Sequence, residues 1–509
     1  MRRQLSTLLA LLLLKVCLMA PPALAGARRG LEPGTRSRTK VAKVRKKPTQ
    51  AKRAPKVPEA VEEPEALEEP EALEAPEAVA APKADDAPGL EKVGLEPEAP
   101  ASEVPSDGLP PLPAENTTST PQAEDPLLQI GGELLLRGQA RTSRGSDQLD
   151  ATFTTPSIVE TYLDARPNER LRGMVTGRLN YDPTLAGTPG APNPSILLDQ
   201  LWLRFDVGRK VFFTVGKHKV KWGASQSWNP TDFLSPQRRD LLNTFDNRVG
   251  TDMLKVHVPW EERGWNFYAL GLVDRAGPTE RPLRFGGAVR AEVLLGGAEV
   301  ALSGVVRQGQ RPQLGLDVTS ALGDVDVFAE LALRRGVDEP LYRFLPDAPA
   351  DGPLDSRFEE WRPEGWLPAV SGGLSYPIAL SHDDVLSLGA EYFYNSTGYT
   401  QPEVLPYLLL KGRYQPFYAA RQYAAVRAQL QLSDGVTTDT FSLTTLANLA
   451  DRSFLARVDA GIQCLNMLML ELFVSVPFGR AGGEFRPTSP EAPGTPALFE
   501  AGVGLRVRI

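Results

Sequence analysis

The sequence predicts an all-β protein: a transmembrane antiparallel up-and-down β-barrel of about 18 strands, within a range of about 14–18, behind a disordered Pro/Glu/Ala-rich segment. Three observations favour this fold. Apolar and polar side chains alternate with a period of two through residues 127–509. Charge lies on one parity of nearly every such window, which suits strands with one face in lipid and one in a polar lumen. Short Gly-containing turns alternate with long loops.

The first 25 residues have the pattern of a secretory signal peptide. Arg2 and Arg3 precede an apolar run from Leu8 to Leu14, and Ala23-Leu24-Ala25 supplies the small residues of a cleavage site. A retained anchor is the alternative, but the run is shorter than the roughly 20 residues that a spanning helix needs. We therefore predict export and cleavage after Ala25.

Residues 26–126 predict a disordered periplasmic spacer with a basic and then an acidic part. Residues 27–56 carry 12 basic and 1 acidic side chains, whereas residues 57–126 carry 2 basic and 19 acidic ones. Proline recurs every six residues, at 58, 64, 70, 76 and 82, which prevents a continuous helix. Two interpretations of residues 27–126 stay open: a tether with a periplasmic or cell-wall partner, or an extension without a specific partner. Export argues against nucleic acid as the partner.

Composition argues against most catalytic and metal sites. The chain has two cysteines, Cys17 and Cys464, and three histidines, which excludes a disulfide framework and a Cys-based zinc site. No motif brings a nucleophile, a base and an orienting group together. No Gly-rich phosphate loop or HExxH pattern is present. We predict that the protein is not an enzyme and holds no cofactor and no metal.

The alternation in residues 127–509 defines the candidate strands. In 324–335, for example, Val327 and Leu331 share the apolar parity, while Glu330 and Arg334 share the other. Nineteen windows qualify: 127–142, 157–166, 170–180, 196–206, 210–222, 248–259, 264–273, 284–295, 298–307, 313–320, 324–334, 366–376, 384–394, 404–413, 421–432, 437–447, 454–464, 467–476 and 497–509. Barrels of single bacterial chains have even strand numbers, so at least one window is not a strand. The weakest are 366–376 and 404–413, which Gly and Pro interrupt.

Turns and loops divide between the two rims. Gly296-Gly297, 206–209 and 433–435 predict tight turns, whereas 181–194, 223–247, 336–365 and 477–496 are long and rich in Pro, Gly and charge. Outer-membrane barrels have short turns at the periplasmic rim and long loops at the other.

The last window predicts how the barrel closes. Phe499, Val503, Leu505 and Ile509 lie on one parity of 499–509, opposite charged and glycine residues. A barrel in lipid must pair its last strand, because an open edge would leave backbone groups unsatisfied. The run resembles the C-terminal targeting signal of outer-membrane barrels, although Ile509 stands where Phe is commoner. The resemblance implies that residues 499–509 are recognised by the barrel assembly machinery.

One stretch carries a family resemblance. Val215-Gly216 leads to Trp222-Gly223 and then to 229–232, Asn-Pro-Thr-Asp. This V-G-x-x-x-x-x-W-G and N-P-x-D pattern resembles an uncharacterised family of Gram-negative porin-like outer-membrane barrels. The resemblance implies insertion in outer-membrane lipid and a pore. Porin-like barrels are often trimers, but the sequence does not decide the oligomeric state.

Basic side chains near the same stretch are the candidate pore or rim residues: Lys217, Lys219, Lys221, Arg238 and Arg239. Basic rings in a pore favour anions such as phosphates or acidic sugars. The alternative is that they meet lipid headgroups or solvate a rim. The acidic loop 336–365 has two interpretations of its own: a cation-binding or inward-folded segment, or a solvated loop.

Two functions follow from these features. The first is a porin-like channel for passive or weakly selective transport of small solutes. The alternative is a structural barrel of a cell-envelope machine for motility, adhesion or polysaccharide export, tethered through its spacer.

Overall fold

The computed structural model describes residues 127–144, 149–185, 193–235, 237–243, 245–246, 248–275, 283–349, 352–487 and 497–509. The signal peptide (1–25) and the spacer (26–126) lie outside the described residues, so both stay predictions. Among the helices that the structure describes, none is both long and apolar enough to cross a membrane.

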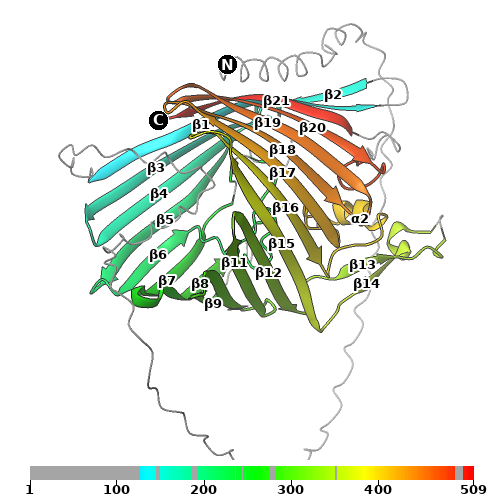
Figure 1. Ribbon diagram of the computed structural model, residues 1–509. Coiled ribbons are helices and arrows are strands. Elements are labelled where there is room, and N and C mark those ends of the chain that lie inside the picture. The colour runs from blue at the N-terminus through cyan, green and yellow to red at the C-terminus, as the bar shows by residue number, and fades with distance from the viewer. Residues whose placement is uncertain are drawn as a thin grey trace, which may run out of the picture. The chain divides into compact units, whose positions relative to one another are not determined.

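In the described part of the chain, eighteen antiparallel strands form one closed barrel (Figure 1). Strands that follow each other in the sequence pair with each other, which is the up-and-down arrangement that the sequence predicts. The first half of the wall is built by β1 (Leu128–Arg144), β3 (Ser157–Asn168), β4 (Leu171–Tyr181), β5 (Ser195–Val207), β6 (Val211–His218), β7 (Thr251–Trp260), β8 (Trp265–Arg275), β9 (Leu283–Leu295) and β10 (Ala298–Arg307). The second half contains β11 (Gln313–Leu322), β12 (Val325–Arg335), β15 (Trp366–Ala379), β16 (Val385–Asn395), β17 (Gln422–Ser433), β18 (Thr438–Asn448), β19 (Ser453–Leu465), β20 (Leu468–Gly479) and β21 (Ala497–Arg508).

Side-chain burial confirms which parity faces outward. In β10, Leu302 and Val306 are 60% and 61% exposed, whereas Ala301 and Val305 on the other parity are buried. In β12, the inward parity includes Glu330, which is 2% exposed. The apolar parity of each strand therefore forms the outer surface, where it would meet lipid, and the polar parity lines the lumen.

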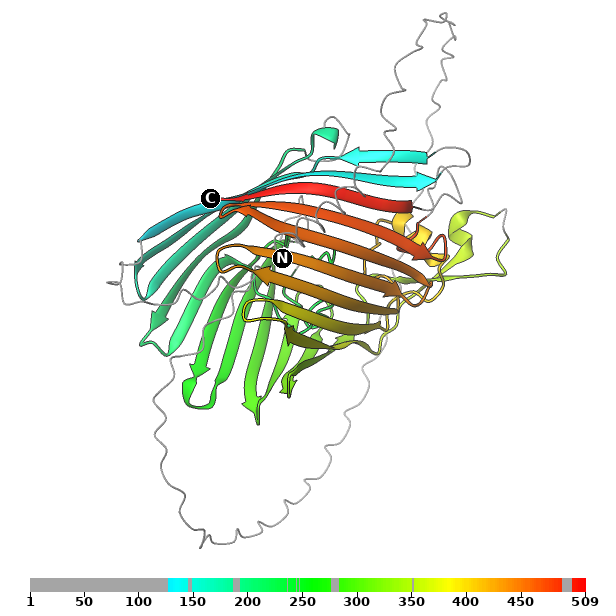
Figure 2. The same cartoon turned by 45° about the horizontal axis from the view of Figure 1, so that its top comes forward.

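The last strand closes the barrel as predicted. β21 pairs with β20 on one side and with β1 on the other, and Figures 1 and 2 show β21 in red beside β1 in cyan. Backbone bonds join Ile509 and Gly132 in both directions, at 2.9 and 3.0 Å. On the inward parity, Arg506 bridges Glu133 at 2.9 Å and Glu471 at 2.6 Å.

One barrel strand is interrupted. The short strand β2 (Leu149–Thr154) also pairs with β1, and its register continues that of β3: Gln139 lies opposite Thr154, and Leu136 lies opposite Ser157. Pro156 lies in the gap between β2 and β3 and has no N–H to donate to the ladder. We therefore count β2 and β3 as one wall strand, of which the sequence pattern predicts only the second part.

The two rims differ as predicted. The connections at the rim where β1 begins span two to five residues each: 169–170, 208–210, 261–264, 296–297, 323–324, 380–384, 434–437 and 466–467. We call this end the turn rim. The long connections 219–250, 336–365 and 396–421 lie at the opposite end, which we call the loop rim.

The window 404–413 is not a strand, and this prediction was wrong. Residues Val404–Leu410 form the helix α2, which buries Val404, Leu405 and Tyr407. Pro406 lies in its first turn, where a proline is tolerated. The other weak window, 366–376, is the wall strand β15. Residues Leu341–Phe344 (β13) and Phe358–Trp361 (β14) form a separate hairpin at the loop rim. Its Tyr342 ring packs edge-on against the Tyr407 ring of α2, with 4.9 Å between the ring centroids.

Candidate functional site: a loop inside the barrel

Residues 219–250, which connect β6 to β7, lie against the inner wall, and we call them the lumen loop. Ser225, Trp228 and Thr231 are 0% exposed, although the sequence predicts only a long loop at one rim here. Their hydrogen-bond partners include side chains of the distant wall strands β11, β12, β15 and β16. The loop therefore occupies part of the lumen that the wall strands enclose.

Glu330 of β12 is the first anchor of the lumen loop. Its Oε1 accepts a hydrogen bond from the Ser225 amide at 2.6 Å and from Asn229 Nδ2 at 3.2 Å. Its Oε2 accepts from the Thr231 amide at 3.2 Å and the Thr231 hydroxyl at 2.7 Å. Four donors from one loop thus solvate a buried carboxylate, which is how such a charge is tolerated away from water.

Glu391 of β16 is the second anchor. It accepts hydrogen bonds from the Ser227 amide at 2.8 Å and the Trp228 amide at 2.7 Å. Trp228 also donates from Nε1 to the carbonyl of Phe417 at 2.8 Å and stacks on Phe393 with 5.7 Å between ring centroids. The loop is therefore fixed to the wall by charge and by aromatic packing together.

The family-like motif has a structural explanation in this anchoring. Gly223 has a φ of +95°, and a Cβ there would lie 2.7 Å from the Glu330 carboxylate oxygens. Gly216 has a φ of +121°, and a Cβ there would lie 2.2 Å from the Leu201 carbonyl oxygen. Trp222 is buried beneath the guanidinium of Arg290, 5.6 Å from the ring centroid. Only glycine allows the chain to leave β6 and approach Glu330 this closely.

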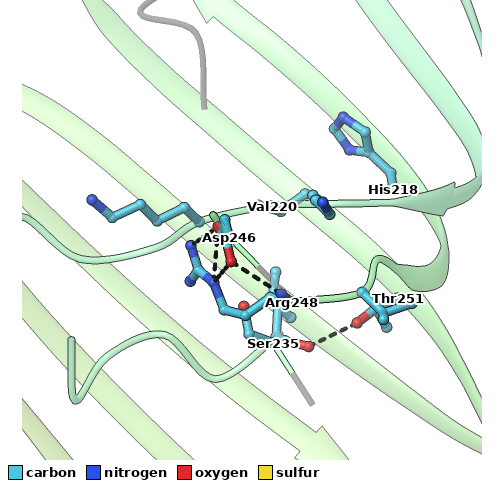
Figure 3. A pocket seen from close by; sticks show the side chains of 10 residues that line it. His218, Val220, Ser235, Asp246, Arg248 and Thr251 are labelled. Carbon is cyan, nitrogen blue, oxygen red and sulfur yellow. Dashed lines mark hydrogen bonds and ion pairs between the residues drawn. The ribbon is translucent and has the colours of Figure 1, made fainter. Parts of the chain in front are cut away.

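The last part of the lumen loop is held by Arg248. Its guanidinium pairs with Asp232 at 2.9 Å and with Asp246 at 2.7 Å. Figure 3 shows Asp246 and Arg248 turned toward each other, beside His218 and Thr251 at the ends of β6 and β7. Burial acts to raise the pKa of Asp246, but the hydrogen bonds and charge of Arg248 outweigh it and hold that pKa below its ordinary value.

Two of the five predicted site residues do not line the pore as free cations. Lys217 lies opposite Leu201 and Asp252 in the ladder, and both are exposed on the outer face, so register places Lys217 there too. Lys219 enters the lumen but pairs with the fully buried Asp199 at 3.6 Å. Arg178 also pairs with Asp199, so the two cations share one carboxylate.

The other three, Lys221, Arg238 and Arg239, lie on the lumen loop. Arg238 donates to the Asn229 carbonyl at 3.3 Å and covers the Tyr418 ring at 5.3 Å, and Arg239 donates to the Gln226 carbonyl at 3.0 Å. The Lys221 side chain is solvent-accessible but surrounded by protein groups, and this partial desolvation, followed by the guanidinium groups of Arg239 and Arg248, lowers its pKa. The lumen loop therefore brings like charges together.

Two wall arginines, which the sequence pattern did not single out, complete this group. Arg334 of β12 and Arg238 repel each other electrostatically, as do Arg427 of β17 and Arg239. Carboxylates attract these cations from a distance: Asp338 attracts Arg334, Glu391 and Asp459 attract Arg427, and Glu330 and Asp232 attract Lys221. No ion pair within the described residues includes any of the five cations. We call them the basic cluster: Lys221, Arg238, Arg239, Arg334 and Arg427.

Open space adjoins the basic cluster. A cavity of ≈ 760 Å³ is lined by the cations Arg238, Arg239, Arg307 and Arg334 and also by the carboxylates Asp232, Asp240, Asp274 and Asp338. A second cavity of ≈ 570 Å³ continues toward the loop rim under β13 and α2. Volumes of this size accommodate small organic molecules.

The acidic loop 336–365 contacts the segment around α2. Glu339 pairs with Arg413 at 2.9 Å, and Asp355 pairs with Lys411 at 3.1 Å. Within the described ranges, no group of His, Cys, Asp and Glu side chains is placed to hold a metal ion.

A buried carboxylate connects its own loop to the 396–421 loop and to the ends of β17 and β18 at the loop rim. Glu484, between β20 and β21, accepts hydrogen bonds from Tyr423 at 2.6 Å, Tyr414 at 3.1 Å, Asn448 at 2.8 Å and the Phe417 amide at 2.8 Å. Burial raises the pKa of Glu484 to about 7, although these hydrogen bonds act to lower it.

We expect the stability of this rim cluster to fall as pH rises through about 7. The folded pKa of Glu484 exceeds its ordinary value of 4.5, so the folded state binds the proton more tightly. The contribution is complete below about pH 4.5 and is lost above the folded pKa. Limited proteolysis of the 396–421 and 480–487 loops from pH 5 to 8.5 measures this. Glu484→Gln, which cannot titrate, should flatten the profile, and an unchanged profile in that variant would assign the effect to another group.

Comparison with known proteins gives only distant relatives by structure. The chain is similar to Pseudomonas aeruginosa OccK11 (OpdR), at 12% identity and a TM-score of 0.43, over 75% of this chain and 96% of that one. It is similar to Acinetobacter baumannii OccAB1, at 11% identity and a TM-score of 0.44, over 75% and 96%. A triple mutant of Rhodopseudomonas blastica porin is 11% identical, with a TM-score of 0.37, over 75% and 100%. No protein-family model and no curated protein matches the sequence.

Proposed function

We propose that the protein is an outer-membrane channel through which small solutes diffuse past the lumen loop, with a preference for anions. The observation that carries the proposal is the lumen loop itself, which narrows the barrel at the basic cluster and leaves cavities beside it. A barrel of this strand number is wider than one that side chains alone can fill, so its interior is an aqueous space.

The basic cluster supplies the preference. None of the five cations has an ion-pair partner among the described residues, and three of them, Arg238, Arg239 and Arg334, line the cavity beside the loop. A low dielectric nearby strengthens their field. A small carboxylate or phosphate entering there would reduce the repulsion between them, whereas a cation would increase it. Pores lined with Arg and Lys select anions for this reason.

The triple variant Lys221→Gln, Arg238→Gln, Arg239→Gln is expected to lose most of this anion preference. Three of five cations disappear while side-chain size changes little, so the anion/cation permeability ratio should fall about threefold or more toward unity. The measurement is the reversal potential across a planar bilayer under a KCl gradient. Lys217→Gln is the matched control, because Lys217 lies on the outer face. A triple variant with wild-type reversal potential would refute the role of the cluster.

The orientation follows from the rims. We place the turn rim in the periplasm and the loop rim outside, as in outer-membrane barrels generally. Residues 26–126 then extend into the periplasm from the start of β1, and residues 499–509 are available to the assembly machinery. The alternative function, a structural barrel tethered through its spacer, depends on residues outside the described part of the chain.

A further inference from the structure

A groove crosses the outer face of the barrel over β7 to β11, near the loop rim. Its floor lies where Ala269, Gly271, Gly287 and Gly304 occupy outward positions that elsewhere carry large apolar side chains. Register puts Gly271 of β8 between Leu254 of β7 and Gly287 of β9. The groove has a volume of ≈ 600 Å³.

The walls of the groove are apolar. They are formed by side chains of the surrounding outward parity: Val256, Val289, Val306, Leu314 and Trp366. The floor of the groove carries no side chain larger than a methyl group. Lipid hydrocarbon therefore packs poorly against it, unless a chain of similar width fills the groove. An acyl chain has that width. By moving from the surrounding lipid into the groove it would gain closer apolar contacts.

Two arginines lie at the loop-rim end of the groove. Arg335, an exposed residue on the outward parity of β12, is opposite Trp366 of β15, and its amide donates to the Pro312 carbonyl at 3.1 Å. Arg311 is its neighbour, because a Cβ on Gly336 would lie 3.7 Å from Arg311 Nε. No ion pair in the described part of the chain includes Arg311 or Arg335. An apolar groove thus ends at two cations and a tryptophan.

We propose that this groove binds a phosphorylated lipid of the outer leaflet, with one acyl chain over Gly271 and Gly287 and a phosphate beside Arg311 and Arg335. The inference rests on the membrane orientation proposed above. Lipid A combines phosphates with saturated chains and is the lipid that matches both ends of the groove. A second copy related by a two-fold axis fits less well, because that contact would bring the arginines of both copies together.

Native mass spectrometry of the purified barrel with added lipid A tests the proposal. Gly271→Leu fills the groove, and its Cβ meets no atom within 4 Å, so the variant is expected to fold. It should reduce the lipid A-bound fraction about tenfold at limiting lipid. This is the effect expected if roughly two methylene groups of the acyl chain lose their contact with the groove. Gly177→Leu on the outer face of β4 is the matched control, since its Cβ would be 3.9 Å from the nearest atom. Arg311→Gln with Arg335→Gln should abolish the preference for lipid A over phosphatidylcholine.

Equal lipid A binding by the wild type and Gly271→Leu would overturn the proposal. Loss of an oligomer in Gly271→Leu, without a change in bound lipid, would also overturn it and assign the groove to a second copy. Heat-modifiable migration confirms that each variant is folded. Conductance is recorded on the same variants, so that a failure of the channel proposal is seen separately from a failure of the lipid site.

Discussion

Replacing Glu330 and Glu391 together with alanine is expected to raise the single-channel conductance about twofold or more, because the lumen loop loses both anchors. The two carboxylates accept six hydrogen bonds from the loop, four at Glu330 and two at Glu391. Hydrogen bonds to charged groups contribute roughly 1.5–3 kcal/mol each. Losing these bonds removes on the order of several kcal/mol of anchoring free energy. The ratio of detached to wall-bound lumen loop should therefore rise by more than about a hundredfold.

Planar-bilayer recording of the double variant measures this effect. Glu299→Ala is the control, since Glu299 is a wall carboxylate of β10 whose electrostatic neighbours, Glu292, Arg290 and Asp317, all lie on the wall. Wild-type conductance and noise in the double variant would mean that other contacts, such as Trp228 with Phe393, hold the loop without the carboxylates.

Deletion of residues 499–509 is expected to abolish the folded barrel. β21 is hydrogen-bonded on both sides, to β20 and to β1, so its loss leaves two open edges in the wall. In hydrocarbon each unpaired backbone group costs several kcal/mol, and a strand of this length leaves many of them. The deletion also removes Arg506, the cation with which both Glu133 and Glu471 pair.

Heat-modifiable gel migration of outer-membrane fractions measures this loss. The full-length chain should migrate as a compact species until it is boiled, and the truncated chain should not. Ile509→Phe is the matched control, because it restores the commoner terminal residue on an exposed outward position and should assemble at least as well as the wild type. A truncated chain that still resists detergent would show that the wall closes in another way.

The wall was predictable from the sequence because lipid imposes one simple pattern on every strand. Val327, Leu331 and their equivalents had to be apolar, so a period of two was visible without knowledge of any partner. The window 404–413 failed because Leu408, Leu409 and Leu410 form an apolar run without alternation, and such a run is equally typical of a short buried helix. The break at Pro156 was missed because β2 is too short to show a period.

The site was less predictable because its contacts are remote in sequence. Glu330 and Glu391 lie about a hundred residues or more from the loop they anchor, and each was visible only as a polar residue on the inward parity. The sequence left open whether Lys217 faces the pore or the rim, because proximity in sequence to Lys219 and Lys221 does not reveal that the ladder turns it outward. Two signals were present, namely the glycines 216 and 223 and the donor-rich run 225–231, and both mark a close backbone approach.

The central claim is that an aqueous path leads through the barrel beside the lumen loop. Single-channel recording of the wild-type protein in a planar bilayer tests it most directly. The claim predicts discrete openings whose reversal potential under a KCl gradient has the sign of an anion-preferring pore. A correctly folded, bilayer-inserted barrel that conducts no ions at any voltage would contradict it.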